Sequence, residues 1–242
     1  MVGDGVAGDG VVGDGVAGDG VAASQVVGLD QVRLTATLLV PEVRLYLAAD
    51  AIILWARLEA EARRVLPPPY WASAWVGGQA LARYVLDHPQ VVRGLRVLDL
   101  AAGCGQAGIA AALAGAASVE ANDIDPYAQR AIALNAGANA VVVALSHSDL
   151  LEGAGGDAEV VLAGDVFYSQ EMAQRMHRFM RRVTSRGALV LIGDPGRAFL
   201  PHDWLQPLTS YQVPTTHGIE DAEIKQTQVL RPRTVPEGLS HT

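Results

Sequence analysis

The sequence predicts an α/β fold in which helices cover both faces of a mostly parallel sheet. From Arg96 onward, short apolar runs alternate with segments of helical periodicity. Strands of roughly four to eight apolar residues, separated by helices of about 10 to 15 residues, are typical of βαβ units. Half of the 242 residues are hydrophobic, enough for one buried core. We therefore expect a single domain over residues 24–242.

A repeat precedes this domain. Residues 3–22 are four copies of a five-residue unit, GDGVA or GDGVV. Two glycines in each unit leave much backbone entropy and little side chain to bury, so residues 1–23 are predicted to be a disordered tail. Calcium binding is not expected, because the calcium β-roll repeat has a nonapeptide period.

The first part of the domain reads as a helical cap over residues 41–88. A first helix is predicted over Pro41–Arg64 from apolar residues at three- and four-residue steps, namely Val43, Leu47, Ala51, Leu54 and Leu58. Prolines 67–69 end this helix, and a second helix is expected to begin after Gly77 and Gly78 and to end before Pro89.

The core of the domain is expected over residues 94–231, where strands and helices alternate. At its end, YQVPT and KQTQVL are predicted to pair as an antiparallel hairpin. The alternating segments before that hairpin are RVLDLA, AGIAAALAGA, SVEAND, PYAQRAIALNAGA, AVVVALS, AEVVLAG, QEMAQRMHRFMRRVT and GALVLIGD.

Composition excludes several classes of protein. A formal net charge of −8 argues against a nucleic-acid partner, since phosphate contacts need a concentrated basic face. Cys104 is the only cysteine and the six histidines are scattered, so neither a disulfide nor a metal site is expected. The N-terminus lacks the pattern of a signal peptide, and the most apolar helical window, Leu45–Leu58, is too short to span a bilayer. These features predict a soluble cytoplasmic protein with no membrane contact.

A glycine loop marks a ligand site. VLDLAAGCG, residues 97–105, is a strand that runs into glycines ahead of a helix, an arrangement that lets a backbone approach a ligand closely. The next strand ends at Asp123, 20 residues after Gly103, where a doubly wound sheet places an acid beside the ribose of a nucleotide-like cofactor. Asp125 competes for this role, but Pro126 after it favours a helix N-cap.

Several of the predicted strands are followed by an aspartate at or near their carboxyl end. A single acid after a strand is often a helix cap, but a row of them at the carboxyl edge of a parallel sheet suggests a binding site. The loop after Asp99 reads AAGCGQAG, with the acid two residues before the loop, and the region has no P-loop lysine, so the nicotinamide and ATP interpretations fit poorly. The acids at or near strand ends are Asp99, Asp123, Asp149, Asp165 and Asp194.

The string D-L-A-A-G-C-G resembles the first motif of class I methyltransferases that use S-adenosyl-L-methionine, with Ala101 in place of the first glycine. Together with PPPYWASAWVGGQALARYVLDHP, VRGLRVLDL, ANDIDPYAQRAIALNA, GDVFY and LIGDPGR, it resembles the family of lysine methyltransferases that act on the β-subunit of the electron-transfer flavoprotein. The resemblance runs from about Leu38 to Leu230. It implies a Rossmann-like sheet of seven strands, S-adenosyl-L-methionine as cofactor and the flavoprotein β-subunit as protein partner.

The resemblance also implies roles for individual residues. The methionine part of the cofactor is expected to contact Asp99, Gly103 and Gly105, and the ribose to contact Asp123. Asp149 would bind the adenine amine, and Trp75 with the Gly77–Gly78 turn would close over the cofactor. For Trp71, plain core packing is an equally good interpretation.

The D-x-x-Y motif at Asp165 and Tyr168 matches the position where the target amine enters in this family. Methyl transfer needs orientation and a neutral amine, so Asp165 is expected to bind and aim the amine while Tyr168 lines the channel. A carboxylate also favours the charged ammonium, so Asp165 is expected to act as a positioner and not as a strong base. The alternative is that Asp165 caps the helix beginning near Ser169 and that Tyr168 packs against the sheet.

Three other functions stay open at this point: methylation of a ribosomal protein, methylation of a small amine, and non-catalytic binding of the cofactor. One helix carries several arginines and would either dock an acidic partner or present a solvated face. These are Arg175, Arg178, Arg181 and Arg182.

Overall fold

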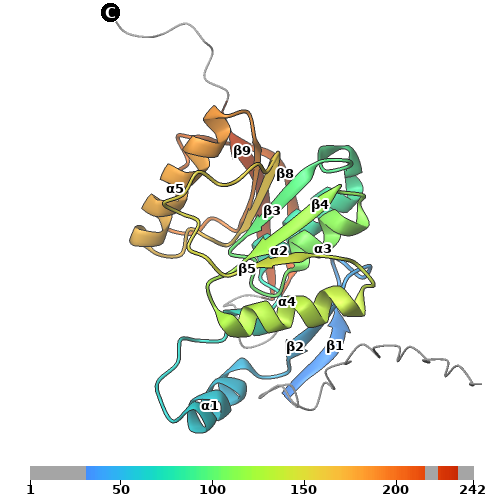
Figure 1. Cartoon of the computed structure of the whole chain (residues 1–242), viewed down its shortest axis with the longest axis vertical. Coiled ribbons are helices and arrows are strands. Elements are labelled where there is room, and N and C mark those ends of the chain that lie inside the picture. The colour runs from blue at the N-terminus through green and yellow to red at the C-terminus, as the bar shows by residue number, and fades with distance from the viewer. Residues whose placement is uncertain (1–30, 216–222, 234–242) are drawn as a thin grey trace, which may run out of the picture.

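The computed structural model describes residues 31–215 and 223–233, and the repeat tail lies outside them (Figure 1). The strands are β1 (Val32–Ala36), β2 (Arg44–Ala48), β3 (Arg96–Leu100), β4 (Ser118–Asn122), β5 (Ala144–Ser146), β6 (Val160–Gly164), β7 (Leu189–Asp194), β8 (Leu205–Pro214) and β9 (Ile224–Pro232). The helices are α1 (Ala51–Ala62), α2 (Val76–Asp87), α3 (Gln106–Leu113), α4 (Pro126–Ala138) and α5 (Gln170–Ser185), with 3₁₀ turns η3 (Tyr70–Ala72) and η4 (Pro89–Val91).

A seven-stranded sheet forms the centre of the described chain, in the order β5-β4-β3-β6-β7-β9-β8. Strands β3 to β7 are parallel, whereas β9 runs antiparallel to both β7 and β8. The predicted α/β fold with a C-terminal antiparallel hairpin is confirmed. Strands β4 and β5 follow β3 on one side of the sheet, whereas β6 and β7 lie on its other side, so the strand order reverses between β3 and β6. In such a sheet the crevice for a ligand lies between the carboxyl ends of these two strands.

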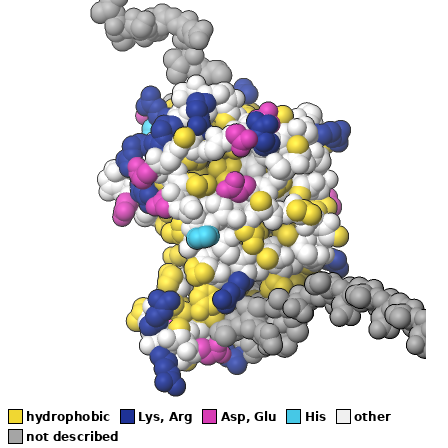
Figure 2. All heavy atoms as spheres, in the orientation of Figure 1, with side chains coloured by type: hydrophobic (Ala, Val, Ile, Leu, Met, Phe, Trp, Pro, Cys, Tyr) yellow, Lys and Arg dark blue, Asp and Glu magenta, His cyan; other side chains and the backbone are white. Residues whose placement is uncertain are grey.

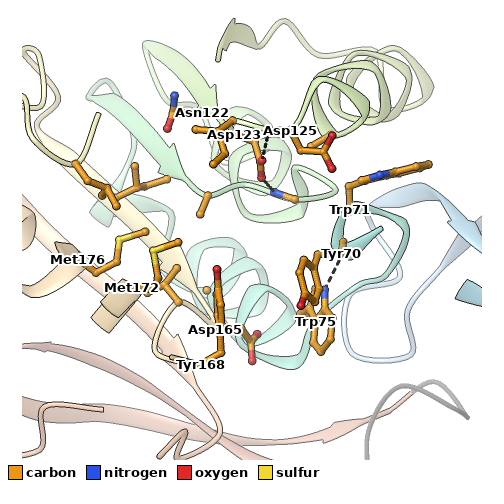
Figure 3. A pocket seen from close by; sticks show the side chains of 18 of the residues that line it. Tyr70, Trp71, Trp75, Asn122, Asp123, Asp125, Asp165, Tyr168, Met172 and Met176 are labelled. Carbon is orange, nitrogen blue, oxygen red and sulfur yellow. Dashed lines mark hydrogen bonds between the residues drawn. The ribbon is translucent and has the colours of Figure 1, made fainter. Parts of the chain in front are cut away.

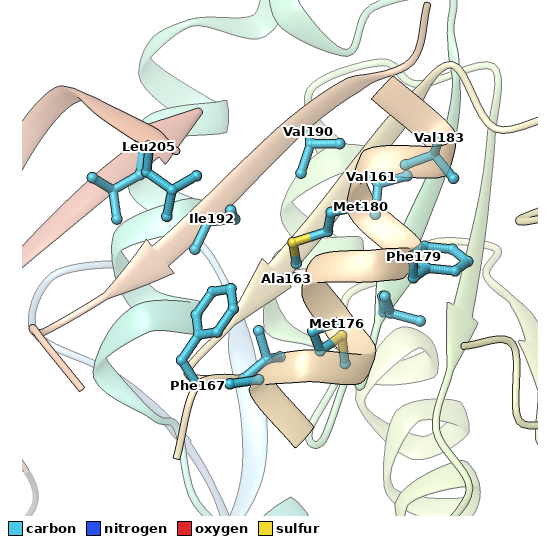
Figure 4. Packing of buried hydrophobic residues seen from close by; sticks show 14 of the residues in the cluster. Val161, Ala163, Phe167, Met176, Phe179, Met180, Val183, Val190, Ile192 and Leu205 are labelled. Atoms are coloured by element: carbon cyan, nitrogen blue, oxygen red, sulfur yellow. The ribbon is translucent and has the colours of Figure 1, made fainter. Parts of the chain in front are cut away.

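Helices bury both faces of the sheet. Alternate residues of one strand point to opposite faces, so Val160 and Leu162 of β6 pack with α2 and α3, while Val161 and Ala163 pack with α5. On the α5 side, Phe167 and Phe179 are fully buried and fill the space between helix and sheet (Figure 4). This double coverage explains why the core strands are continuously apolar in sequence.

The prediction of a helix over residues 41–64 is wrong for the first part of that range. Residues 44–48 form strand β2, which pairs antiparallel with β1, and the helix begins only at Ala51. Leu45 and Leu47 are buried while Arg44 is exposed, which is a strand alternation. Asp50 ends the strand segment and caps α1 by accepting hydrogen bonds from the backbone amides of Ile52 and Ile53.

Helix α2 begins at Val76, ahead of the two glycines and not after them as predicted. Its first turn lies directly against the ends of β6 and β7. A Cβ atom on Gly77 would overlap the Gly193 carbonyl oxygen, and one on Gly164 would reach the Gly78 backbone nitrogen at 2.7 Å. Glycines at these positions therefore allow the N-terminus of α2 to approach the edge of the sheet where the site lies.

Candidate active site

A cavity of about 420 Å³ opens beyond the carboxyl ends of β3, β4 and β6 (Figure 3). Of the eight residues predicted for the site, the two that do not line the cavity are Asp99 and Gly105. The six that line it are Trp75, Gly103, Asp123, Asp149, Asp165 and Tyr168. Residues from five separate parts of the sequence thus meet where the topology places a ligand crevice.

The glycine loop is built from left-handed backbone conformations. Ala101, Gly103 and Gly105 have φ angles of 54°, 57° and 78°. Ala101 keeps the turn even though a side chain disfavours that region. A Cβ atom on Gly103 would meet no atom within 4 Å, so this position faces open space in the cavity.

Asp99 and Gly105 support the loop from behind. The Asp99 carboxylate is buried and accepts a 2.7 Å hydrogen bond from the Gly108 amide in the first turn of α3. Burial raises the pKa of Asp99 to about 7. Gly105 precedes α3 as its N-cap, and a Cβ atom there would come within 3.1 Å of the Ile132 side chain. Both residues fix the start of α3 and do not line the cavity.

Asp123 connects the second strand to the glycine loop. Its Oδ2 accepts a 2.9 Å hydrogen bond from the Gly103 amide, and its Oδ1 accepts one of 3.0 Å from the Asp125 amide. Burial raises its pKa. Asp125 itself caps α4 by accepting from the Tyr127 amide, as its position before Pro126 predicted. The cavity therefore has a fixed carboxylate beside an open backbone turn.

Asp149 is paired with α5. Its Oδ2 accepts a 2.7 Å hydrogen bond from Nη2 of Arg175, and this pairing lowers the pKa of Asp149. Arg175, Met172 and Met176 all line the cavity from α5. These three residues were not predicted to belong to the site, although the helical spacing of 172, 175 and 176 places them on one face.

The arginines of α5 have mixed roles. Arg175 is used within the site, and Arg182 donates to the carbonyl oxygens of Leu151 and Gly153. Arg178 and Arg181 are exposed. Figure 2 shows basic side chains with acidic ones between them over this edge of the molecule. Half of the arginine cluster is thus committed to contacts inside the chain.

Asp165 lies on the opposite side of the cavity from Asp123 (Figure 3). It is 8% exposed and adopts a φ of 57°, unusual for a residue with a side chain. Its Oδ2 accepts a 2.5 Å hydrogen bond from the Gly77 amide, and its Oδ1 accepts from Arg197. Burial raises the pKa of Asp165 to about 6, although the Arg197 charge acts to lower it. The alternative role as a helix cap is wrong, because Ser169 caps α5.

Three aromatic side chains form the rim beside Asp165. The ring of Tyr168 stacks on that of Tyr70 with centroids 6.2 Å apart, and Tyr70 lies 5.9 Å from Trp75. Tyr168 is half exposed, so its alternative role of packing against the sheet is wrong, and Phe167 packs there instead. Trp71 is buried and stacks on Tyr127, which agrees with core packing.

Tyr70 and Arg197 are two further residues of the cavity that were not predicted from the sequence. Both lie in strings that carry the family resemblance, PPPYW and DPGR, but those strings by themselves assign neither residue a role. Tyr70 accepts a 2.8 Å hydrogen bond at its carbonyl oxygen from Nε1 of Trp75, and the Arg197 guanidinium lies 5.6 Å from the Trp75 ring centroid. Both residues therefore hold Trp75 in place.

The charges around the cavity favour a cationic ligand. Four acids line it, namely Asp123, Asp125, Asp149 and Asp165, against the two arginines Arg175 and Arg197. An excess of negative charge in a concave site raises the local concentration of cations. Within the described residues no cluster of three or more potential metal ligands occurs, and no helix there is long and apolar enough to cross a membrane.

Comparison with known proteins gives a consistent picture. Residues 68–209 match the model of a family described as lysine methyltransferase. The chain is 43% identical over 194 residues to the electron transfer flavoprotein beta subunit lysine methyltransferase of Xenopus laevis, covering 76% of this chain and 77% of that protein. The protein of the same name from Danio rerio is 39% identical over 205 residues, which cover 82% of this chain and 79% of that protein. A ribosomal protein L11 methyltransferase of Syntrophotalea carbinolica is 38% identical over 99 residues, with 40% and 32% covered.

Proposed function

This chain belongs to the lysine methyltransferase family and is an S-adenosylmethionine-dependent enzyme, and we propose that its substrate is a lysine of the electron-transfer flavoprotein β-subunit. The proposal is supported chiefly by one observation, that two pairs of residues face each other across one cavity. Gly103 and Asp123 form one side, and Asp165 and Tyr168 form the other. One side suits a nucleoside and the other suits an amine.

The residues of the cavity fit S-adenosylmethionine. Asp123 is a fixed carboxylate suited to ribose hydroxyls, and the open turn at Gly103 suits the amino-acid end of the cofactor. Asp149, with the apolar side chains of Met172 and Met176, suits the adenine. When bound, the cofactor supplies a methyl group on a positively charged sulfur, and the excess of acids in the cavity favours that charge.

The chain's own residues prepare the lysine amine. A free lysine has a pKa of about 10.4, so most of it arrives as ammonium and loses a proton to water before it reacts. Tyr168, half exposed on the rim, lies where it can guide the side chain past Tyr70. Asp165 holds the first turn of α2 through Gly77 and so fixes the wall against which the amine is aligned.

A methyltransferase acting on ribosomal protein L11 is the second candidate, supported by the relative that matches 40% of the chain. That relative shares a shorter segment than the flavoprotein enzymes do. The non-catalytic alternative does not apply to a chain of this family.

The test is a direct transfer assay. The enzyme is incubated with radiolabelled S-adenosylmethionine and, separately, with purified flavoprotein β-subunit and purified ribosomal protein L11. Label on lysine in the β-subunit, located by mass spectrometry, is the expected result. Label on L11 with none on the β-subunit contradicts the proposed substrate, and reactions without enzyme serve as the control.

A further inference from the structure

The Asp165 carboxylate is hydrogen-bonded to an arginine, Arg197, that lies outside the D-x-x-Y motif. Arg197 donates two hydrogen bonds to its Oδ1, from Nη2 at 2.6 Å and from Nε at 3.2 Å. The arginine side chain is 21% exposed and the aspartate 8%, so water screens this pair only weakly. The charge of Asp165 is therefore balanced within the protein before any substrate arrives.

The backbone around Arg197 is built to hold this position. Asp194 ends β7, is fully buried, and accepts 2.7 Å hydrogen bonds at Oδ1 from the amides of Gly196 and Arg197. Gly196 adopts a φ of 89°, which closes the turn that returns Arg197 toward the cavity. The tight D-P-G-R turn thus places the guanidinium between Asp165 and the ring of Trp75.

A lone carboxylate at this point would act against the reaction. An ionised carboxylate beside an amine stabilises the ammonium form, whose nitrogen has no lone pair to attack with. If the aspartate and the amine shared one proton, it would lie on the amine, which has the higher ordinary pKa. Pairing with an arginine removes that effect, because arginine stays charged at every relevant pH.

We propose that Arg197 is a positioning residue that neutralises Asp165 and anchors it against α2, so that the substrate amine meets a site without net negative charge. This inference rests on the proposed lysine methylation. It gives the DPGR turn a role in keeping the amine reactive, in addition to its role in fixing Trp75. The charged groups facing Asp165 are Arg197 and, at longer range, Asp194, both from the segment that ends β7, while α2 presents the Gly77 amide.

The first test measures kcat against pH with the purified flavoprotein β-subunit as methyl acceptor, since this profile reports groups in the enzyme–substrate complex. In Arg197→Met, we expect the rise in kcat to move to higher pH by about one unit or more, with activity recovering at alkaline pH. Arg197→Lys should keep the wild-type midpoint even with a lower rate. In the double variant Arg197→Met with Asp165→Asn, the midpoint should return toward that of the wild type.

Three outcomes overturn the inference: an unmoved midpoint in Arg197→Met, a double variant that shifts as far as Arg197→Met, or an Arg197→Met enzyme that binds cofactor yet stays inactive at every pH. Arg178→Met, on the exposed face of α5, is the matched control and should leave the profile unchanged. If wild-type enzyme does not label the β-subunit, the proposed function fails instead.

A second test needs no substrate. The side-chain carboxyl signals of ¹³C-labelled aspartates are titrated by NMR in the free enzyme, with Asp165→Asn used for assignment. Loss of Arg197 should raise the titration midpoint of Asp165, because burial is then opposed only by the hydrogen bond from the Gly77 amide. An unchanged midpoint contradicts the charge balance, whatever the substrate of the enzyme is.

Discussion

The Asp165 carboxylate accepts from Gly77 on one oxygen and from Arg197 on the other, with distances of 2.5 Å to the Gly77 nitrogen and 2.6 Å to Arg197 Nη2. This single side chain therefore joins the end of β6, the start of α2 and the turn after β7. A residue expected to bind the substrate amine directly is held by protein groups on both sides. Its contribution to catalysis is best tested by separating its charge from its hydrogen bonds.

Replacing Asp165 should separate transfer from cofactor binding. Asp165→Ala removes the acceptor for the buried Gly77 amide and leaves Arg197 without this partner, so we expect kcat to fall by at least about 100-fold. Asp165→Asn keeps an acceptor and tolerates the left-handed backbone, so its loss should be smaller. Steady-state kinetics and calorimetric titration with S-adenosylmethionine check this, and full activity of Asp165→Ala would show that the assigned role is wrong.

Asp123 should control cofactor affinity. Asp123→Ala removes a fixed carboxylate from the cavity and the acceptor of the Gly103 amide. Hydrogen bonds to charged groups contribute about 1.5–3 kcal/mol, which corresponds to a roughly 10- to 100-fold weaker Kd. The exposed Asp203→Ala is the control. An Asp123→Ala enzyme that binds S-adenosylmethionine as the wild type does would remove Asp123 from the binding site.

The buried Asp99 should make stability depend on pH. Burial raises its pKa from the ordinary value of 3.8 to about 7 in the folded state, so the folded chain favours the protonated form. Stability from this group is full below about pH 4 and is lost as pH rises toward 7. Asp99→Asn keeps an acceptor for Gly108 and does not titrate. We expect the free energy of unfolding of the wild type to decline relative to this variant between pH 4 and 7 in urea denaturation, and parallel curves would contradict the burial argument.

Two neighbouring glycines of α2 should respond oppositely to alanine. Gly77→Ala forces a methyl group into the Gly193 carbonyl and the Asp165 carboxylate, and overpacking of this kind costs about 1–3 kcal/mol. A Cβ at Gly78 meets no atom within 4 Å, so Gly78→Ala should stabilise the helix by up to about 1 kcal/mol. Thermal unfolding of both variants measures this. Equal shifts in Tm would mean that α2 does not approach the sheet as closely as the glycines indicate.

Periodicity predicted some elements of the fold and failed for others. The apolar runs of β3, β6 and β7 predicted strands because both faces of those strands are buried, and Asp125 with Pro126 predicted the start of α4. The error at residues 44–48 has a physical cause. Val43 and Leu47 are four residues apart, which suits a helix, but Leu45 between them is also buried and fits the two-residue alternation of a strand.

The sequence by itself determined the α/β class, the glycine loop, the acids at the strand ends and the family resemblance, because each is written in residues close together along the chain. Only the tertiary structure decided which of those residues share the cavity. Asp99 lies behind the loop, whereas Arg197, 32 positions after Asp165, contacts its carboxylate. Local spacing carries no information about such contacts, since they depend on how parallel strands and their connecting turns align at one edge of the sheet.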